Sequence, residues 1–219
     1  MKPELIIFDF DGTIADTTAI ILETYRRTIA ELKAEHRSDK ACRATIGIPL
    51  RDGFRKLYPK FNDVELDKCV ATYRRIYSSL KDEMRPRLYP GVIETLDELK
   101  RHNVMMAIAS SRSKESLLEY CAKQEILNYF DEILGADDVC HAKPAPEAVL
   151  KIMKKMNARA ENTIVIGDMP VDIAMGRSAS CMTVGVEYGN STPDALEAAG
   201  ADIIVDFMPT MLPAIGLAE

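Results

Sequence analysis

The segment Leu5-Ile6-Ile7-Phe8-Asp9-Phe10-Asp11-Gly12-Thr13 decides the fold that we predict for this chain. It opens with a continuous run of four apolar residues, which is typical of a strand buried on both faces of a parallel sheet. Two carboxylates at positions i and i+2, followed by glycine, then stand at the carboxyl end of that strand. Open α/β sheets bind their ligands at this end of the strands. An ordinary turn is the alternative, because Asp and Gly commonly end strands.

Further along the chain, short apolar runs alternate with helical patterns, such as Val92, Leu96 and Leu99 at i, i+4 and i+7. Strands that alternate with helices indicate a parallel sheet covered by helices. We therefore predict an α/β fold with a Rossmann-like, doubly wound, mainly parallel sheet. The further runs expected to be strands are residues 104–109, 133–134, 163–166, 182–186 and 203–205.

Residues 16–87 break this alternation, because they carry helical patterns and no convincing buried strand. Apolar residues recur at helical spacing around Tyr25 and again around Tyr73, while residues 46–50 have the composition of a turn or loop. We predict an inserted α-helical cap domain at residues 16–87. The α/β catalytic core would then consist of residues 1–15 and 88–219.

Composition and charge exclude several classes of function. The chain has 219 residues and a formal net charge of −6, so we expect neither nucleic acid nor a membrane surface as a partner. The five scattered cysteines argue against a disulfide framework, and the three histidines leave few ligands for zinc. The N-terminal apolar run meets an acid too early for a signal peptide, so we expect a cytoplasmic protein.

Polar residues also follow the later predicted strands. Ser110, Ser111 and Arg112 come after the second run, and Asp168 and Asp172 come after a later one. Hydroxyl and backbone N–H groups at the start of a helix can hold an anion, although a lone serine there is more often only an N-cap. The acids could bind a metal, or Asp172 could simply favour a helix N-terminus. Lys143 precedes a proline in a loop, where a lysine is usually solvated.

These strand ends fit one reaction, the transfer of a phosphoryl group. Asp9 would be the nucleophile, since carboxylates can form aspartyl phosphate, and Asp11 would be the general acid and then the general base. Mg²⁺ prefers carboxylate ligands, and Asp9 and Asp168 could hold it. Lys143 would offset the negative charge of Asp9 or of the phosphoryl group. The residues expected to bind the phosphate are Gly12, Ser110, Ser111, Arg112 and Lys143.

In this combination and order, the residues resemble the haloacid dehalogenase superfamily. The resemblance rests on Asp9-Phe10-Asp11-Gly12-Thr13, Ser110, Lys143, Gly167-Asp168 and Asp172. It implies that Asp11 also gives Mg²⁺ its backbone carbonyl, that Asp168 is a metal ligand, and that Asp172 supports the ligands from behind. It further implies that a helical cap closes over the core and selects the substrate. Four other stretches are similar to phosphoglycolate phosphatases: residues 45–50, 89–92, 143–146 and 184–186.

Two positions depart from the pattern of that family. Met169 stands where relatives often carry Ser or Thr, and Ser111-Arg112 replaces the more common Asn-Lys. Arg112 could contact phosphate, although an exposed arginine at the start of a helix is the more ordinary interpretation. In the cap, a substrate carboxylate could pair with an arginine near Gly47, or these arginines could be solvated. The cap arginines concerned are Arg43, Arg51 and Arg55.

We therefore predict a Mg²⁺-dependent phosphatase that acts on a small phosphomonoester, with phosphoglycolate as the model substrate. A phosphomutase similar to β-phosphoglucomutase is the nearest alternative, because it would use the same aspartyl phosphate. An inorganic pyrophosphatase or a nucleotidase could use the same scaffold. A signalling module phosphorylated on Asp is a non-enzymatic alternative, but such modules are shorter and lack an insertion like residues 16–87.

Overall fold

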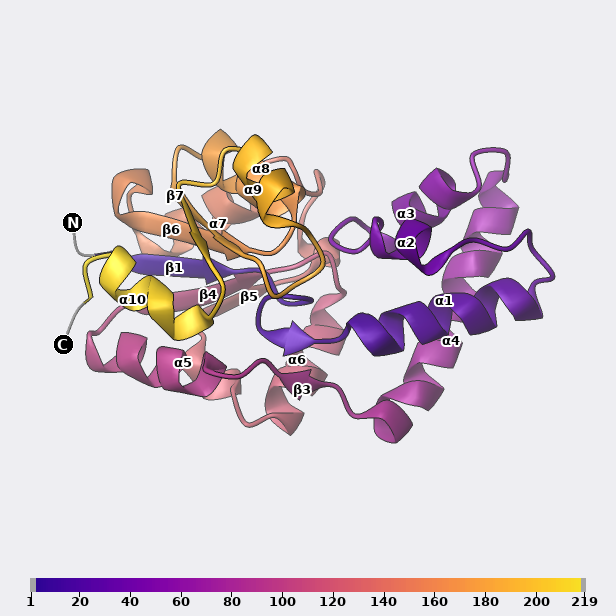
Figure 1. Ribbon diagram of the computed structural model, residues 1–219, viewed down its shortest axis with the longest axis horizontal. Helices are drawn as coiled ribbons and strands as arrows, with labels where there is room; N and C mark the ends of the chain where they lie inside the picture. Colours follow the sequence, from indigo (N-terminus) through magenta and orange to yellow (C-terminus); the bar gives the residue numbers. More distant parts are fainter. Residues whose placement is uncertain (1–2, 218–219) are drawn as a thin grey trace.

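Six parallel strands form the central sheet of the computed structural model, which describes residues 3–217 (Figure 1). The strand order is β5-β4-β1-β6-β7-β8. Strand β1 lies between β4 and β6, where the direction of winding reverses, and ligands bind beside such a switch point. The strands are β1 (Leu5–Phe8), β4 (Met105–Ala109), β5 (Glu132–Leu134), β6 (Thr163–Gly167), β7 (Met182–Val186) and β8 (Ile203–Val205).

Strand β1 is central because its four side chains are apolar and have no exposed surface. Leu5 pairs with Met105 on one side and with Thr163 on the other. A strand covered in this way loses apolar surface to helices on both faces, at about 25 cal/mol for each Å² removed from water. The predicted doubly wound, mainly parallel sheet is confirmed.

Helices cover both faces of the sheet (Figure 1). One apolar cluster joins Phe8 to α5, α6 and α10, and a second joins Ile7 to α7 and α8. Successive side chains of β1 therefore pack on opposite faces of the sheet, as the period of two in a strand requires. The helices around the sheet are α5 (Val92–Arg101), α6 (Lys114–Lys123), α7 (Glu147–Met156), α8 (Pro170–Ser178), α9 (Pro193–Ala198) and α10 (Met211–Ala214). Four short 3₁₀ turns are η1 (Leu127–Tyr129), η2 (Ala136–Asp138), η3 (Ala160–Asn162) and η4 (Met208–Thr210).

Four more helices lie beyond the carboxyl ends of the strands, at the right of Figure 1. They pack around an apolar cluster of their own, which includes Tyr25, Phe54 and Tyr73. The antiparallel pair β2 (Ala15–Asp16) and β3 (Arg87–Leu88) joins this group to the sheet. The four helices are α1 (Thr18–Glu31), α2 (Asp39–Arg43), α3 (Leu50–Leu57) and α4 (Asp63–Met84), and we call them the helical insertion.

The division into a core of residues 1–15 and 88–219 and a cap of residues 16–87 stays a prediction. Its terminal residues 1–2 and 218–219 lie outside the described part of the chain. Within residues 3–217, every helix is too short or too polar to cross a lipid bilayer.

Candidate active site

A cavity of about 600 Å³ lies between the helical insertion and the carboxyl edge of the sheet. Asp9, Asp11, Ser110 and Arg112 line it from the side of the sheet. The insertion contributes, among others, Tyr25, Tyr73 and Tyr77. A concave site where acids, a hydroxyl and a cation converge beside apolar walls is the usual form of a small-molecule site.

Lys143 joins two buried carboxylates in one hydrogen-bonded group. Its Nζ lies 2.5 Å from Asp9 Oδ1 and 2.7 Å from Asp172 Oδ1. Asp9 follows β1, Lys143 precedes α7, and Asp172 lies in the first turn of α8. All three side chains are buried, so the ion pairs lie in a medium that screens them far less than water does. Lys143 therefore orients Asp9 and cannot be the solvated loop lysine that was the alternative.

Asp168 comes directly after β6 and is held by Asn190. The backbone N–H of Asn190 donates to Asp168 Oδ2 at 2.7 Å, and its side-chain Nδ2 donates to the same oxygen at 2.9 Å. Asn190 Oδ1 in turn accepts from Thr18 and Arg43 of the helical insertion, at 2.8 and 3.3 Å. Asn190 is not among the site residues predicted from the sequence. Its position after the run 182–186, which forms β7, was the signal that could have found it, because the rule on strand ends applies there too.

Burial dominates the electrostatics of the acidic group. It raises the pKa of Asp9 well above the usual range, against the attraction of Lys143. Burial, assisted by the charge of Asp172, raises the pKa of Asp168 to about 7. For Lys143, burial lowers the pKa, but Asp172 and Asp9 outweigh it and the pKa lies above its ordinary value. Three carboxylates beside one ammonium leave an excess of negative charge that a cation would relieve.

The donor set suits a hard divalent cation. Asp9, Asp168 and Asp172 each offer a carboxylate oxygen, and these oxygens lie within 4.8 Å of one another. Mg²⁺ prefers such oxygen ligands and keeps several waters. Both oxygens of Asp172 already accept hydrogen bonds, from Lys143 and from the N–H of Met169. Among the described residues, Asp168 Oδ1 accepts only a long bond of 3.4 Å from Thr13, and Lys143 bonds Oδ1 of Asp9. The geometry therefore favours Asp9 and Asp168 as ligands, with Asp172 behind them.

Asp11 is held apart from this group by two other side chains. Thr17 donates to Asp11 Oδ1 at 2.6 Å. Arg112 makes a forked pair with Asp11, with Nη2 at 2.6 Å from Oδ1 and Nε at 3.2 Å from Oδ2. Only 9% of the Arg112 side-chain surface is exposed. The exposed arginine favoured by the sequence is therefore wrong, because the Asp11 carboxylate offsets the cost of removing the guanidinium from water.

Ser110 and Ser111, which are also expected to bind phosphate, line the same cavity, and Gly12 lies beside the acidic group. Ser110 Oγ accepts from the backbone N–H of Arg112 at 3.2 Å, which closes a turn after β4. Ser111 Oγ donates to the carbonyl of Gly47 at 2.7 Å and so ties the sheet to a loop of the helical insertion. Gly12 has φ +96°, and a Cβ there would collide with Asp168 and Asn190. The backbone at Gly12 thus passes directly against the acidic group.

The cap arginines have protein partners. Arg51 pairs with Asp63 and Asp67, and Arg55 pairs with Asp63, all at the surface. Arg43 bonds Asn190 instead. Arg51 alone among these three lines the cavity.

Comparison with known proteins places the chain in a family. The family model of haloacid dehalogenase-like hydrolases matches residues 6–186. The chain is a haloacid dehalogenase-like hydrolase. This confirms the resemblance that the motifs indicated.

The relatives of this haloacid dehalogenase-like hydrolase include phosphatases. It is 36% identical to "Probable phosphatase IndB" of Dickeya dadantii, over 94% of this chain and 90% of that protein. It is 30% identical to the pyrophosphatase PpaX of Halalkalibacterium halodurans, over 99% of both. Among solved structures, "a predicted phosphoglycolate phosphatase" of Haemophilus somnus superposes with a TM-score of 0.89 at 21% identity, over 98% of both chains, which shows the shared fold. Together, the family and these relatives make the chain a phosphatase.

Proposed function

We propose that this phosphatase hydrolyses a small phosphomonoester through an aspartyl phosphate on Asp9, with Mg²⁺ as cofactor. The observation that carries the proposal is the convergence of Asp9, Lys143, Asp168 and Asp172 at the carboxyl ends of β1 and β6. A buried carboxylate that a lysine orients at the wall of a cavity supports a nucleophilic role for Asp9. The substrate would be a small phosphorylated metabolite.

In the first half-reaction, an Asp9 oxygen attacks phosphorus, and the bond from phosphorus to the ester oxygen breaks. Asp11 supplies the proton that the departing alkoxide needs. In the second half, Asp11 takes a proton from water as the water attacks phosphorus, and the bond to Asp9 breaks to release inorganic phosphate. Lys143 and the N–H groups after β4 would offset charge on the phosphoryl oxygens. Mg²⁺, held by Asp9, Asp168 and the Asp11 carbonyl, would supply further neutralisation of that charge.

For the substrate, phosphoglycolate is our first candidate, and the support is the similarity of residues 45–50 and 143–146 to phosphoglycolate phosphatases. Inorganic pyrophosphate is a second candidate, because a full-length relative at 30% identity is named a pyrophosphatase. Both substrates carry a second anionic group beside the phosphoryl group that reacts. A phosphomutase would pass the phosphoryl group to a second hydroxyl in place of water.

The test is a substrate panel with the full chain and Mg²⁺. The panel should include phosphoglycolate, pyrophosphate, sugar phosphates and nucleoside monophosphates at matched concentrations, with kcat/KM from phosphate release. We expect one small anionic substrate to exceed the others, with one phosphate released per ester consumed. Acid-quenched enzyme should carry a phosphoryl group on the peptide that contains Asp9. Turnover without any phosphoryl-enzyme on that peptide would overturn the proposal, and release that needs a bisphosphate activator would indicate the mutase.

A further inference from the structure

Arg112 makes more contacts in the cavity than a phosphate-binding arginine needs. Its forked pair with Asp11 uses Nε and Nη2, and the remaining nitrogen, Nη1, donates to Tyr77 Oη at 2.9 Å and to Ser116 Oγ at 3.0 Å. The guanidinium carbon also lies over the rings of Phe10 and Tyr77, at 5.6 and 5.0 Å from their centres. A guanidinium fixed by two carboxylate bonds, two hydroxyls and two rings is held in one orientation.

These contacts span three separate parts of the chain. Asp11 follows β1, Arg112 follows β4, and Tyr77 belongs to α4 of the helical insertion. Tyr77 is the only one of the three that comes from the insertion. The position of α4 over the sheet is thereby connected to the carboxylate that would handle protons in the proposed reaction.

We propose that Arg112 is a positioning residue for Asp11, and that Tyr77 makes this positioning depend on how α4 lies over the site. The inference rests on the proposed function, because it requires Asp11 to be the acid and base. It differs from the phosphate contact that the sequence suggested. The guanidinium nitrogens already have protein partners, so Arg112 acts on the reaction through Asp11.

The two roles of Asp11 give this proposal a distinctive kinetic signature. Transfer of the phosphoryl group to Asp9 needs a proton only when the leaving group is poor, such as an alkoxide. The attack of water on the phosphoryl-enzyme needs a base whatever the first leaving group was. Loss of positioning should therefore lower kcat/KM for an alkyl phosphate but spare it for p-nitrophenyl phosphate. With the latter ester, a burst of nitrophenol should precede slow turnover.

The experiment compares Arg112→Ala with wild type on both esters. We expect kcat/KM for the alkyl ester to fall about 10- to 100-fold, the range for a misplaced catalytic group, and to change less than about threefold for p-nitrophenyl phosphate. Added guanidinium ion should restore part of the loss. Arg112→Lys should remain impaired, because a lysine keeps the charge but not the fork. Tyr77→Phe keeps the ring, removes the hydroxyl and should give a smaller loss of the same pattern.

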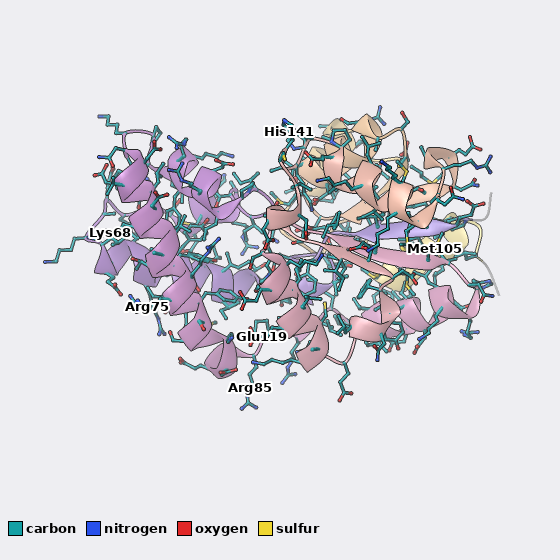
Figure 2. All side chains as sticks on the ribbon, turned by 180° about the vertical axis from the view of Figure 1, so that it is seen from behind. Lys68, Arg75, Arg85, Met105, Glu119 and His141 are labelled. Carbon is teal, nitrogen blue, oxygen red and sulfur yellow. The ribbon has the colours of Figure 1, made fainter. Side chains whose placement is uncertain are left out.

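Two controls make the test decisive. Asp11→Asn should show the same selectivity between esters, and adding Arg112→Ala to it should cost little more, since the two residues act as a unit. Arg75→Ala removes an arginine from the outer side of α4, where it pairs with Glu31, and should behave as wild type (Figure 2).

The other possible results contradict either the positioning role of Arg112 or the proposed role of Asp11. If Arg112→Ala lowers kcat/KM equally for both esters and weakens inhibition by phosphate, Arg112 is a phosphate contact. If the loss is equal and inhibition by phosphate is unchanged, Arg112 is purely structural. If Arg112→Ala is faster than wild type, the contacts of Arg112 inhibit the enzyme. If Asp11→Asn itself shows no preference between esters, the acid and base assignment of the proposed function fails as well.

Discussion

At the scale of single residues, the acids at the site of this phosphatase differ in their partners. Asp9 is held by Lys143, Asp168 by Asn190, and Asp11 by Thr17 and Arg112. Lys143 leaves Asp9 at the wall of the cavity, whereas the amide of Asn190 fixes one oxygen of Asp168. In the proposed function, identical carboxylates would serve attack, metal binding and proton transfer because different groups face them.

Replacement of Asp9 by Asn should abolish turnover and leave the fold intact. The amide is nearly isosteric but is not a nucleophile, and Lys143 keeps Asp172 as its partner. We expect activity to fall by at least about 10⁴-fold with an unchanged circular dichroism spectrum. The exposed Asp206 follows β8 much as Asp9 follows β1, so Asp206→Asn is the matched control and should retain full activity. Turnover by Asp9→Asn at the wild-type rate would remove the nucleophile assignment.

Gly12→Ala should inactivate the enzyme and destabilise it. The backbone there has φ +96°, which strains any residue with a Cβ, and the added atom would displace Asp168 and Asn190. We expect a loss of about 1–3 kcal/mol in the free energy of unfolding from the strain alone. Urea unfolding monitors the stability, and phosphate release monitors the activity. A fully active, equally stable variant would show that the backbone at this turn can shift to accommodate the added methyl group.

At the scale of elements, the loops and helix starts carry the chemistry, and the strands set their positions. Polar groups after β1, β4, β6 and β7 all meet beside β1, because parallel strands place their carboxyl ends on one edge. Side-chain hydrogen bonds attach the helical insertion to this edge in addition to its covalent connections. Ser111 bonds the Gly47 carbonyl, Arg43 and Thr18 bond Asn190, and Arg112 bonds Tyr77.

The start of α4 offers a test of stability that leaves the site alone. Asn62 accepts from the N–H of Glu65 at 3.0 Å, and Glu65 accepts from the N–H of Asn62 at 2.8 Å, which is a complete capping box. Asn62→Ala should therefore lower the free energy of unfolding by about 1 kcal/mol, measured by urea denaturation. Asn62→Asp keeps a capping oxygen and should stay within a few tenths of a kcal/mol of wild type. Equal losses in both variants would mean that the cap does not stabilise the helix.

At the scale of the whole molecule, the cavity exists because two apolar cores face each other. The sheet has its own clusters, and the helical insertion has another around Tyr25, Phe54 and Tyr73. The connection runs through the short pair β2 and β3, while Lys81 of α4 reaches Glu119 of α6 at 2.6 Å. Figure 2 shows Glu119 on the side of α6 that faces the insertion. Surface pairs of this kind contribute little energy, so this pair does not by itself fix the position of the insertion.

The acidic group predicts that Mg²⁺ stabilises the fold independently of catalysis. A cation bound at 100 times its dissociation constant adds about 2.7 kcal/mol to the free energy of unfolding. For a chain of this size, the melting temperature should rise by roughly 5–10 °C between EDTA and saturating Mg²⁺. Asp168→Asn should abolish the rise, and Asp206→Asn should retain it. If Mg²⁺ leaves the melting temperature of wild type unchanged, the metal site is wrong, and full activity in EDTA would lead to the same conclusion.

Local patterns were sufficient for the fold. The run 163–166 forms β6, the run 104–109 forms β4 with its first residue outside, and the weak runs 133–134 and 203–205 form edge strands. Burial on both faces imposes continuous apolar character, and that character can be recognised within a few residues. An apolar pattern does not predict the burial of every side chain. Leu150 lies on an apolar helical pattern, yet almost half of its surface is exposed.

By itself, the sequence determined the sheet, the position of Asp9 and Asp11 after its first strand, and the residue types needed for phosphoryl transfer. Only the tertiary structure decided which groups meet. It paired Arg112 with Asp11 across 101 positions and placed Asn190 against Asp168 across 22. A strand or helix is specified by neighbours that share one backbone segment. Side-chain contacts between distant segments depend instead on how separate elements pack, which no short stretch of sequence specifies.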